Sequence, residues 1–364
     1  MSVTTSDQPD LLALRNACGV VGSDTAGRLF ITGDDALDLL NRLTTNKLEQ
    51  LPDGQGTTTV ITNADGRVVD LLALAALDGG LWCLTSPDYA QTVVDWLDLY
   101  TFVEDISVVD RTNDTFHLTL GGPVAPHAIT SVADISDLAL DAAARSFIAG
   151  ASVVVWRRLA GGADGYDIVG DLADRDAVLA ALVAAGAQAI SQDAWETHRV
   201  LNGMPAMDAE FGLFNNPLEA RLLGAISETK GCYTGQEVLA RLQTYNKIQR
   251  RLMAVDLDVL AAPGTKLIGP DGKNAGQITS VAHTPEGIKG LALVTTRLAT
   301  DGATLTTEPV SAGGTVTLHE ASRTSGKREE QYKRWNATSK SAEVRHLSIS
   351  NMIGINQNSC NQRV

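Results

Sequence analysis

The chain has 364 residues, of which 44% are hydrophobic, 20% charged and 5% aromatic, and its formal net charge is −14. This is ordinary globular usage, which excludes a wholly disordered or collagen-like chain, and the length predicts two or three domains. The acidity argues against a nucleic-acid or anionic-membrane surface, so we expect neither as a partner. The charge is uneven, because residues 320–364 carry +4 and residues 1–319 carry −18. A basic tail, predicted to be disordered, therefore follows an acidic body.

Cysteine usage and the amino terminus bear on compartment and metal binding. The four cysteines lie far apart, with no CxxC pair and no Cys/His cluster, at Cys18, Cys83, Cys232 and Cys360. This spacing disfavours a zinc finger, an iron–sulfur ligand set and a disulfide scaffold, so we expect no metal site. The first residues lack an apolar signal segment, and the longest apolar stretch, 178–190, is too short to span a bilayer. We therefore expect a cytoplasmic chain.

The first third of the chain predicts a small unit of strands and helices. Its elements are expected as strands at 20–21 and 29–31, an amphipathic helix with an apolar stripe after 32–35, strands at 57–62, 67–77 and 81–85, and a helix from 87 to about 100. Asn63-Ala-Asp-Gly66 between two strands is a hairpin signal. Ser86-Pro87-Asp88 supplies an N-cap, a proline at the first helical position and an acid in the first turn.

The middle of the chain predicts a ferredoxin-like unit. A strand at 116–120, a small-residue helical stretch, a hairpin of 152–159 with 166–169, a helix at 175–185 and a strand at 187–190 follow one another. This order is β-α-β-β-α-β. A helix at 192–201 comes next. After Arg251 short strands alternate with Pro/Gly turns up to residue 318, which predicts a small all-β barrel or sandwich.

The stretch Lys230-Gly-Cys-Tyr-Thr-Gly-Gln-Glu237 is the most informative motif. Thr234 and Glu237 have the spacing of a capping box, with Thr234 as the N-cap of a helix. Cys232 then lies near the positive end of that helix and close to Lys230, and both effects favour the thiolate. Cys232 is therefore a candidate reactive cysteine. A loop-to-helix junction with a small buried cysteine is the alternative on local physics alone.

This motif, followed by Ala240-Arg241, resembles the signature of the YgfZ-type tetrahydrofolate-binding proteins, which are similar to the glycine-cleavage aminomethyltransferase. The resemblance extends over roughly residues 19–318. Further blocks similar to that superfamily are Gly27-Arg28, Thr32-Gly-Asp-Asp35, Thr44-Thr-Asn46, Gly54-Gln55 and Gly66-Arg-Val-Val-Asp70. Pro217-Leu-Glu-Ala220 and Arg241-Leu-Gln-Thr-Tyr245 look most like the plastid and cyanobacterial branch.

The resemblance implies an α+β fold in which three domains form an aminomethyltransferase-like ring with folate in its central channel. The expected parts are a discontinuous folate-binding domain at 11–114 plus 192–248, a ferredoxin-like domain at 115–191, a C-terminal β-barrel at 249–319 and the tail at 320–364. It also implies tetrahydrofolate, or a one-carbon derivative, as cofactor. The implied role is assembly or repair of iron–sulfur client proteins, and thereby iron–sulfur-dependent tRNA modification.

The resemblance also implies site residues. Asp70 matches the aspartate that the superfamily places beside the folate, although a strand-end acid without function is the alternative. The superfamily's pterin-binding Glu, two residues before Gly-x-Pro, is Leu201 here, so the carboxylate that would clamp the pterin is missing. Candidate catalytic residues are Cys232 and Lys230; candidate folate contacts are Asp70, Asn202, Glu219, Tyr233, Gly235, Gln236, Glu237 and Arg241.

Two other functions stay open at this point. One is a folate-dependent aminomethyl or methyl transferase that resembles the glycine-cleavage protein, with Asp70 and the channel carrying the reaction. The other is a non-catalytic scaffold for iron–sulfur partners that docks them on the Cys232 loop. The residues themselves do not say whether the chain is an enzyme.

Overall fold

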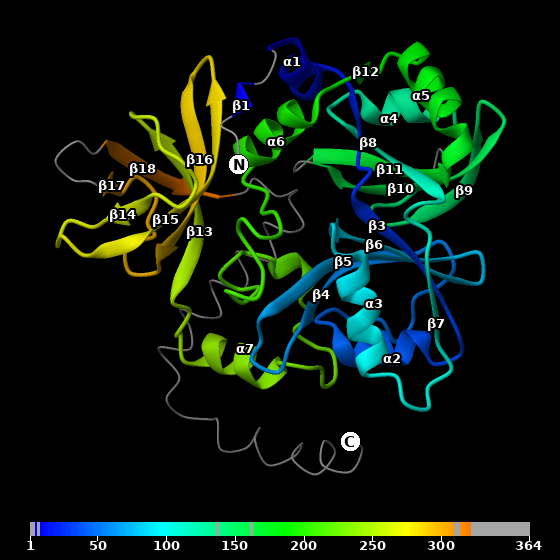
Figure 1. The fold of residues 1–364 in the computed structure, drawn as a ribbon, viewed down its shortest axis with the longest axis horizontal. Coiled ribbons are helices and arrows are strands. Elements are labelled where there is room, and N and C mark those ends of the chain that lie inside the picture. Colours follow the sequence, from blue (N-terminus) through cyan, green and yellow to red (C-terminus); the bar gives the residue numbers. More distant parts are fainter. Residues whose placement is uncertain (1–3, 6–7, 136–137, 161–162, 309–313, 322–364) are drawn as a thin grey trace.

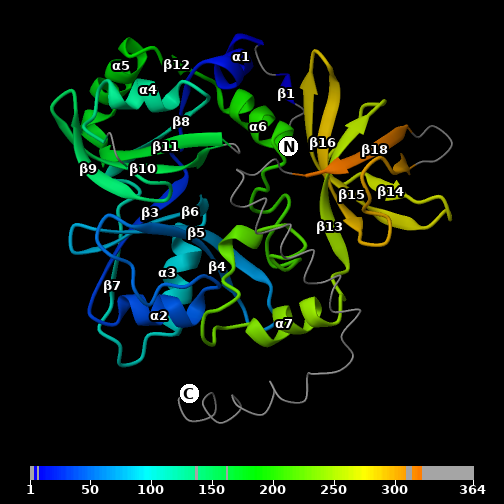
Figure 2. The same cartoon turned by 180° about the vertical axis from the view of Figure 1, so that it is seen from behind.

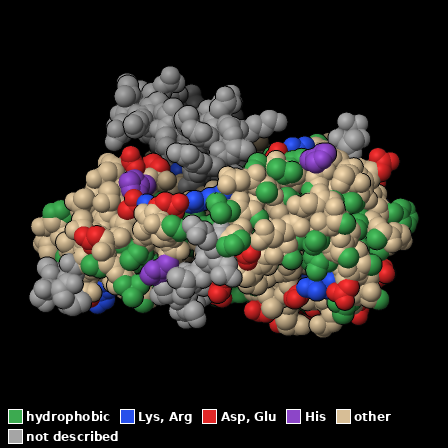
Figure 3. All heavy atoms as spheres, turned by 90° about the horizontal axis from the view of Figure 1, so that it is seen from above, with side chains coloured by type: hydrophobic (Ala, Val, Ile, Leu, Met, Phe, Trp, Pro, Cys, Tyr) green, Lys and Arg blue, Asp and Glu red, His purple; other side chains and the backbone are tan. Residues whose placement is uncertain are grey.

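The computed structural model describes residues 4–5, 8–135, 138–160, 163–308 and 314–321. Three lobes surround the middle of the molecule, each built on its own sheet (Figure 1; from behind in Figure 2). On the face in Figure 3 the Lys and Arg side chains lie in small groups next to Asp and Glu. No helix within the described ranges is both long and apolar enough to cross a membrane. The predicted disordered tail lies outside the described residues, apart from its first two.

The N-terminal lobe is a five-stranded sheet covered on one face by two helices. The strands, in spatial order, are β4 (Gly56–Thr62), β5 (Val68–Leu77), β6 (Gly80–Pro87), β3 (Ala26–Thr32) and β7 (Ser107–Asp110), and the helices are α2 (Ala36–Leu43) and α3 (Ala90–Leu99). Leu39, Leu40 and Leu43 form the buried stripe of α2, which packs on the sheet with Val93 and Leu97 of α3. The expected strand and helix order of this region is observed, although β7 was not predicted. The predicted helix start at Ser86 and Pro87 is wrong, because Pro87 ends β6, Asp88 has a non-helical φ of 64°, and α3 begins at Ala90 with Tyr89 as its N-cap.

The middle lobe is a six-stranded sheet of ferredoxin-like topology with two additions. In spatial order the strands are β12 (Gln188–Ala189), β2 (Gly19–Gly22), β8 (Thr115–Gly121), β11 (Ala163–Asp171), β10 (Ala151–Ala160) and β9 (Ala143–Ile148). Helices α4 (Ala125–Thr130) and α5 (Arg175–Ala184), with the short 3-10 turn η1 (Leu172–Asp174), complete it. Without β2 and β9 the order is that of a split βαβ unit, as expected.

Both additions differ from the sequence expectation. The expected boundaries place the strand at 19–22 in the N-terminal domain, but it lies between β12 and β8, parallel to the first and antiparallel to the second. Its Val20 is buried in the core of the middle lobe. The second addition, β9, is an edge strand that pairs with β10 and that the sequence did not predict.

The two sheets pack face to face. Ala73, Ala75 and Leu77 of β5 and Trp82 and Leu84 of β6 contact a set from the middle sheet: Ala143, Val154, Trp156 and Val169. Because α2 and α3 cover the other face of β5 and β6, these strands are buried on both faces. Burial on both faces explains why the sequences of β5 and β6 are almost continuously apolar.

The C-terminal lobe is a closed six-stranded barrel. Its strands are β15 (Asn274–Thr284), β14 (Lys266–Ile268), β17 (Thr304–Thr307), β18 (Thr315–Glu320), β13 (Arg250–Leu257) and β16 (Gly287–Thr295), and pairing of β15 with β16 closes it. The short strand β1 (Thr4–Thr5) lies parallel to β15. The predicted small β-barrel is confirmed.

The remaining elements join the lobes. Helix α1 (Gln8–Asn16) and helix α6 (Gln192–Leu201) lie between the middle lobe and the barrel, and α6 contacts β15 and β16. An irregular segment, 203–235, with the 3-10 turn η2 (Leu223–Ala225), then leads to α7 (Gln236–Thr244) at the lower edge of Figure 1.

Candidate functional site

Residues 230–235, here called the Cys232 loop, lead into α7, but not by the predicted capping box. Helix α7 begins at Gln236, its N-cap is Gly235 with φ of 82°, and no side chain caps it. Thr234 instead donates its N–H to Arg42 O at 3.0 Å, and Thr62 Oγ1 donates to Thr234 O at 2.5 Å. The predicted capping box of Thr234 and Glu237 is therefore wrong, because the backbone of Thr234 is hydrogen-bonded to Arg42 and Thr62 instead.

Gly235 is required by its surroundings. A Cβ there would lie 2.5 Å from Asn63 O and 3.0 Å from Gly66 Cα, in the turn between β4 and β5. Left-handed backbone and close approach both favour glycine. The Cys232 loop is therefore fixed against the β4–β5 hairpin at its carboxyl end.

Lys230 fixes the other end of the loop. Its Nζ donates to Asn41 O at 2.6 Å, Thr44 O at 2.7 Å and Asn46 O at 2.8 Å. These carbonyls lie at and beyond the carboxyl end of α2, where backbone acceptors lack helical partners and a cation is favoured. Burial lowers the pKa of Lys230 to about 8. All three ammonium donors are engaged, so the side chain anchors the loop; its catalytic role stays a prediction.

The cysteine between these two anchors is exposed. Cys18 and Cys83 are buried, and burial raises the pKa of Cys18 to about 11 and that of Cys83 further still. Low-dielectric surroundings disfavour their thiolates. The local alternative of a buried junction cysteine at Cys232 therefore does not hold.

The other motif residues differ in exposure. Tyr233 is half-buried against Leu218 and Leu239, its ring lies 5.3 Å from Lys230 Nζ, and burial raises its pKa to about 12. The Gln236 N–H donates to Tyr233 O at 3.1 Å. Glu237 and Arg241 are exposed along α7. Tyr233 and Gln236 thus shape the loop, while Glu237 and Arg241 face solvent.

Asp70 lies in β5, fully buried. In the pairing with β4, Ile61 is opposite Asp70 and Thr62 is opposite Val68, so the strand bulges at the residue between. Asp70 Oδ1 accepts the Leu71 N–H at 2.7 Å and Oδ2 accepts the Ser86 N–H at 3.1 Å. Burial raises the pKa of Asp70 to about 7, against the effect of these hydrogen bonds and aided by Asp208. This carboxyl can therefore gain or lose a proton near neutral pH.

Two residues that the sequence analysis missed interact electrostatically with Asp70. Tyr89 Oη donates to Asp208 Oδ1 at 2.8 Å, and burial together with Asp208 raises the pKa of Tyr89 to about 12. Asp208 is exposed and has φ of 61°. Its negative charge contributes to the raised pKa of Asp70. Its place three residues after the Gly-x-Pro was the sequence signal, but its approach to Asp70 is set by the fold.

Leu201 and Asn202 end helix α6. Asn202 is the C-cap residue, and its Nδ2 donates to His198 O at 2.8 Å. His198 is buried, which together with Arg15 lowers its pKa to about 4 and keeps it neutral. Asn202 therefore closes the helix end; its contact with folate stays a prediction.

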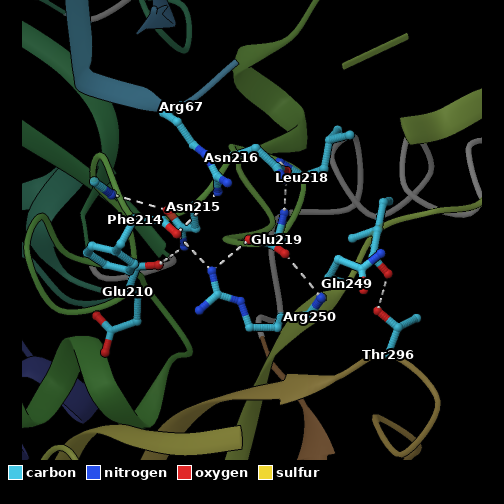
Figure 4. A network of polar contacts seen from close by, with 12 residues as sticks. Arg67, Glu210, Phe214, Asn215, Asn216, Leu218, Glu219, Gln249, Arg250 and Thr296 are labelled. Atoms are coloured by element: carbon cyan, nitrogen blue, oxygen red, sulfur yellow. Dashed lines mark hydrogen bonds and ion pairs between the residues drawn. The ribbon is translucent and has the colours of Figure 1, made fainter. Parts of the chain in front are cut away.

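Glu219 belongs to a network that fastens the irregular segment to the barrel (Figure 4). Its Oε2 pairs with Arg250 Nη2 at 3.0 Å and its Oε1 accepts the Arg250 N–H at 3.2 Å. Arg250 also donates to Phe214 O at 2.9 Å. With both oxygens engaged, Glu219 serves first to join the segment to β13, and its contact with folate stays a prediction.

A second buried carboxylate, missed in the sequence, holds the same segment. Glu210 is fully buried and pairs with Arg199 of α6 at 3.0 Å. It also accepts the Ser280 hydroxyl of β15 at 2.6 Å and the Ala206 N–H at 2.9 Å. These bonds fix residues 206–210, and with them Asp208, relative to α6 and the barrel.

The site residues thus form two groups around the β4–β5 hairpin. Asp70, Tyr89 and Asp208 form one group. The Cys232 loop, anchored by Lys230 and Gly235, forms the other. Thr62 connects them, because it binds the loop and neighbours Ile61, the partner of Asp70.

Comparison with known proteins gives the class. Residues 3–230 match the family described as the GCVT N-terminal domain, and residues 249–324 match the CAF17 C-terminal beta-barrel domain. The glycine cleavage system aminomethyltransferase T from Bartonella henselae has the same fold, with a TM-score of 0.76 at 18% identity, over 86% of this chain and 88% of that one. The chain therefore belongs to the GCVT aminomethyltransferase-like family.

Similar proteins indicate which branch of this family the chain belongs to. The chain is 32% identical over 308 residues, 83% of its length and 71% of the relative's, to "Putative transferase At1g60990, chloroplastic" of Arabidopsis thaliana. It is 26% identical to an aminomethyltransferase of Lysinibacillus sphaericus, over 80% of this chain and 82% of that one. Together with the CAF17-type barrel, these matches identify the chain as a YgfZ-type member with a plastid relative.

Proposed function

We propose that this chain is a cytoplasmic tetrahydrofolate-binding protein that supports the assembly or repair of iron–sulfur proteins, and thereby iron–sulfur-dependent tRNA modification, with Cys232 as its reactive group. The observation that carries the proposal is the Cys232 loop. Among the described cysteines, the one within the family motif is exposed, whereas Cys18 and Cys83 are buried. Lys230 and Gly235 hold the loop that presents it.

The group around Asp70 fits a reduced folate. A pterin presents an amide and an amine on one edge, which pair well with a carboxylate. Leu201 has no carboxylate to offer the pterin, whereas Asp208 has one. Tyr89 donates to Asp208 Oδ1, and no described residue donates to Asp208 Oδ2. Asp70 is less available, because two backbone N–H groups occupy its oxygens. We therefore assign Asp208 the role of the missing carboxylate, with Tyr89 orienting it.

The folate arm is tested by titrating tetrahydrofolate into the protein and following tryptophan fluorescence. Saturable binding is expected, and Asp208→Asn should weaken it roughly tenfold, the loss of one charged hydrogen-bonded pair. Asp134→Asn, at an exposed position of the middle lobe, is the matched control. If the wild type shows no saturable binding, the folate proposal is wrong, and the non-catalytic scaffold for iron–sulfur partners is the alternative that remains.

The cysteine arm is tested in a bacterial strain that lacks its own homologue, with aconitase activity as the readout. The wild-type chain should restore the activity and Cys232→Ala should not. Cys18→Ala, which removes a buried thiol, should restore it. Full rescue by Cys232→Ala would overturn the reactive role of that cysteine.

One observation favours a one-carbon transferase as the second candidate. The pKa of Asp70, raised to about 7 by burial, suits a group that exchanges a proton at neutral pH. The relatives named aminomethyltransferase share this family. Turnover of tetrahydrofolate with an aminomethyl or methyl donor, lost in Asp70→Asn, would decide for the transferase.

A further inference from the structure

Three large apolar side chains are exposed where α3 ends and the chain turns toward β7. Leu99 is 60% exposed, Phe102 82% and Val103 93%. We call these three residues the apolar tip. Single exposed apolar residues are common, but a cluster on one loop is a feature of interaction surfaces.

The apolar tip is held in its exposed position. Glu104 Oε2 accepts the N–H of Phe102 at 2.9 Å and that of Val103 at 3.1 Å, and Glu104 Oε1 accepts Arg42 Nη2 at 2.9 Å. These backbone donors, with Arg42, lower the pKa of Glu104 to about 2, so that the carboxylate stays charged. The tip is therefore preorganised, which reduces the entropy cost of binding a partner.

The apolar tip is tied to the Cys232 loop through the end of α2. Arg42, which binds Glu104 through its side chain, accepts the Thr234 N–H with its main-chain oxygen at 3.0 Å. Lys230 binds the carbonyls next to it. Figures 1 and 2 both place α2, α7 and the α3–β7 connection along the lower edge of the molecule. Arg42 therefore connects the apolar tip to the Cys232 loop, and the elements that carry them lie along the same edge of the molecule.

The negative charge near the apolar tip indicates which kind of partner can bind there. Residues 34–49 and 95–105 contain eight Asp or Glu and two Lys or Arg. Both bases are already in ion pairs, Arg42 with Asp38 and Glu104, and Lys47 with Glu49. An acidic rim repels nucleic acid and anionic lipid, and it attracts a protein surface in which Lys and Arg surround apolar side chains.

We propose that the apolar tip and its acidic rim form the docking surface for a protein partner with an apolar patch ringed by basic residues, and that docking there presents the partner to Cys232. The inference rests on the proposed function, since it concerns the client that the Cys232 loop serves. It adds the surface and the chemistry of that client.

The test uses rescue of aconitase activity in the strain without its own homologue. Phe102→Ser/Val103→Ser should lower the rescued activity roughly tenfold, as the loss of an interface hot spot does. The control is Leu172→Ser/Leu260→Ser, at exposed leucines of the middle lobe and of the barrel, which should rescue like the wild type. Both variants should keep the wild-type melting temperature and folate affinity, because none of these side chains is buried.

Charge is tested separately. Asp98→Lys on α3 should reduce rescue about threefold, whereas Asp134→Lys on the middle lobe should not change it. Equal rescue by Asp98→Lys and the wild type overturns the basic character of the partner.

The outcomes separate this inference from the function beneath it. Failure of the wild type to rescue overturns the proposed function and this inference together. Rescue by the wild type and equal rescue by the Phe102→Ser/Val103→Ser variant overturns the inference alone. A wild-type dimer that this variant dissociates would show that a second copy occupies the tip. Tip-dependent binding to phosphatidylglycerol vesicles would show a membrane instead, and either result overturns the partner proposed here.

Discussion

Replacement of Asp70 by asparagine should stabilise the protein more at pH 8 than at pH 5, relative to the wild type. The Asp70 carboxyl has a pKa of about 7 in the folded protein, because it is buried, against an ordinary value of 3.8. Between these values the folded state holds a proton that the unfolded state lacks, so stability falls by about 1.4 kcal/mol per pH unit as the pH rises. The contribution of Asp70 to the free energy of unfolding is fully present below pH 3.8 and is lost as the pH rises through 7.

From pH 5 to pH 8 the wild type therefore loses about 3 kcal/mol relative to a neutral side chain at this position. The asparagine side chain of the variant carries no charge at either pH. The difference in free energy of unfolding between Asp70→Asn and the wild type should consequently shift by about 3 kcal/mol in favour of the variant. Part of the absolute gain is offset, because the amide nitrogen faces one of the backbone N–H groups that the carboxylate accepted.

Urea unfolding, followed by tryptophan fluorescence at the two pH values, measures this shift; Trp82 and Trp96 lie in the same lobe. Asp98→Asn, at the exposed end of α3, is the control and should show the same difference at both pH values. Asp208→Asn should reduce the wild-type pH dependence, because Asp208 contributes to the raised pKa of Asp70. An Asp70→Asn difference that is equal at pH 5 and pH 8 would refute the reasoning.

Three further predictions concern the Cys232 loop. Lys230→Met should destabilise the protein by about 2–4 kcal/mol, since three carbonyls lose a charged donor, and thermal unfolding next to the same change at an exposed lysine measures it. Gly235→Ala should cost about 3 kcal/mol or more, against about 1 kcal/mol for Gly79→Ala, since both have positive φ but only Gly235 faces a backbone carbonyl; equal melting temperatures would contradict the clash. In a Cys360→Ser background, Ellman's reagent should titrate Cys232 in the native protein and the two buried thiols only after denaturation; a native Cys232 that does not react would contradict its exposure.

Local patterns predicted most elements of the fold. The hairpin turn 63–66, the stripe on α2 and the helix at 192–201 are signalled by residues within a few positions of one another, and all three are observed. The βαββαβ order and the barrel were also predicted, because turn residues separate their strands. The residues of the Cys232 motif identified the family that the comparisons show.

Features that depend on distant parts of the chain were not predicted. The capping box at Thr234 satisfied the local rule, but Arg42 and Thr62 bind the Thr234 backbone and Gly235 must fit against Asn63. A capping pattern describes an isolated helix end, and here tertiary contacts decide where the helix begins.

The site shows the same limit. Asp70 was recognised from its family block. Tyr89 carries no local signature, and the place of Asp208 after the Gly-x-Pro does not by itself indicate an interaction with Asp70. Tyr89 and Asp208 meet because Glu210, bound by Arg199 and Ser280, fixes the segment that holds Asp208. Glu219 and Lys230 were predicted to act on a ligand or a thiol, yet their polar atoms are engaged by the protein itself.

The insertion of β2 into the middle sheet has a consequence for how the protein is made. Residues 19–22 find their partners only when residues 115–121 and 188–189 have been synthesised. The ferredoxin-like lobe is contiguous in sequence from 115 to 191, yet it is not a portable module, because one of its inner strands comes from the amino terminus. Cutting the chain at 115 would leave the β8 edge unpaired and open to association with another chain.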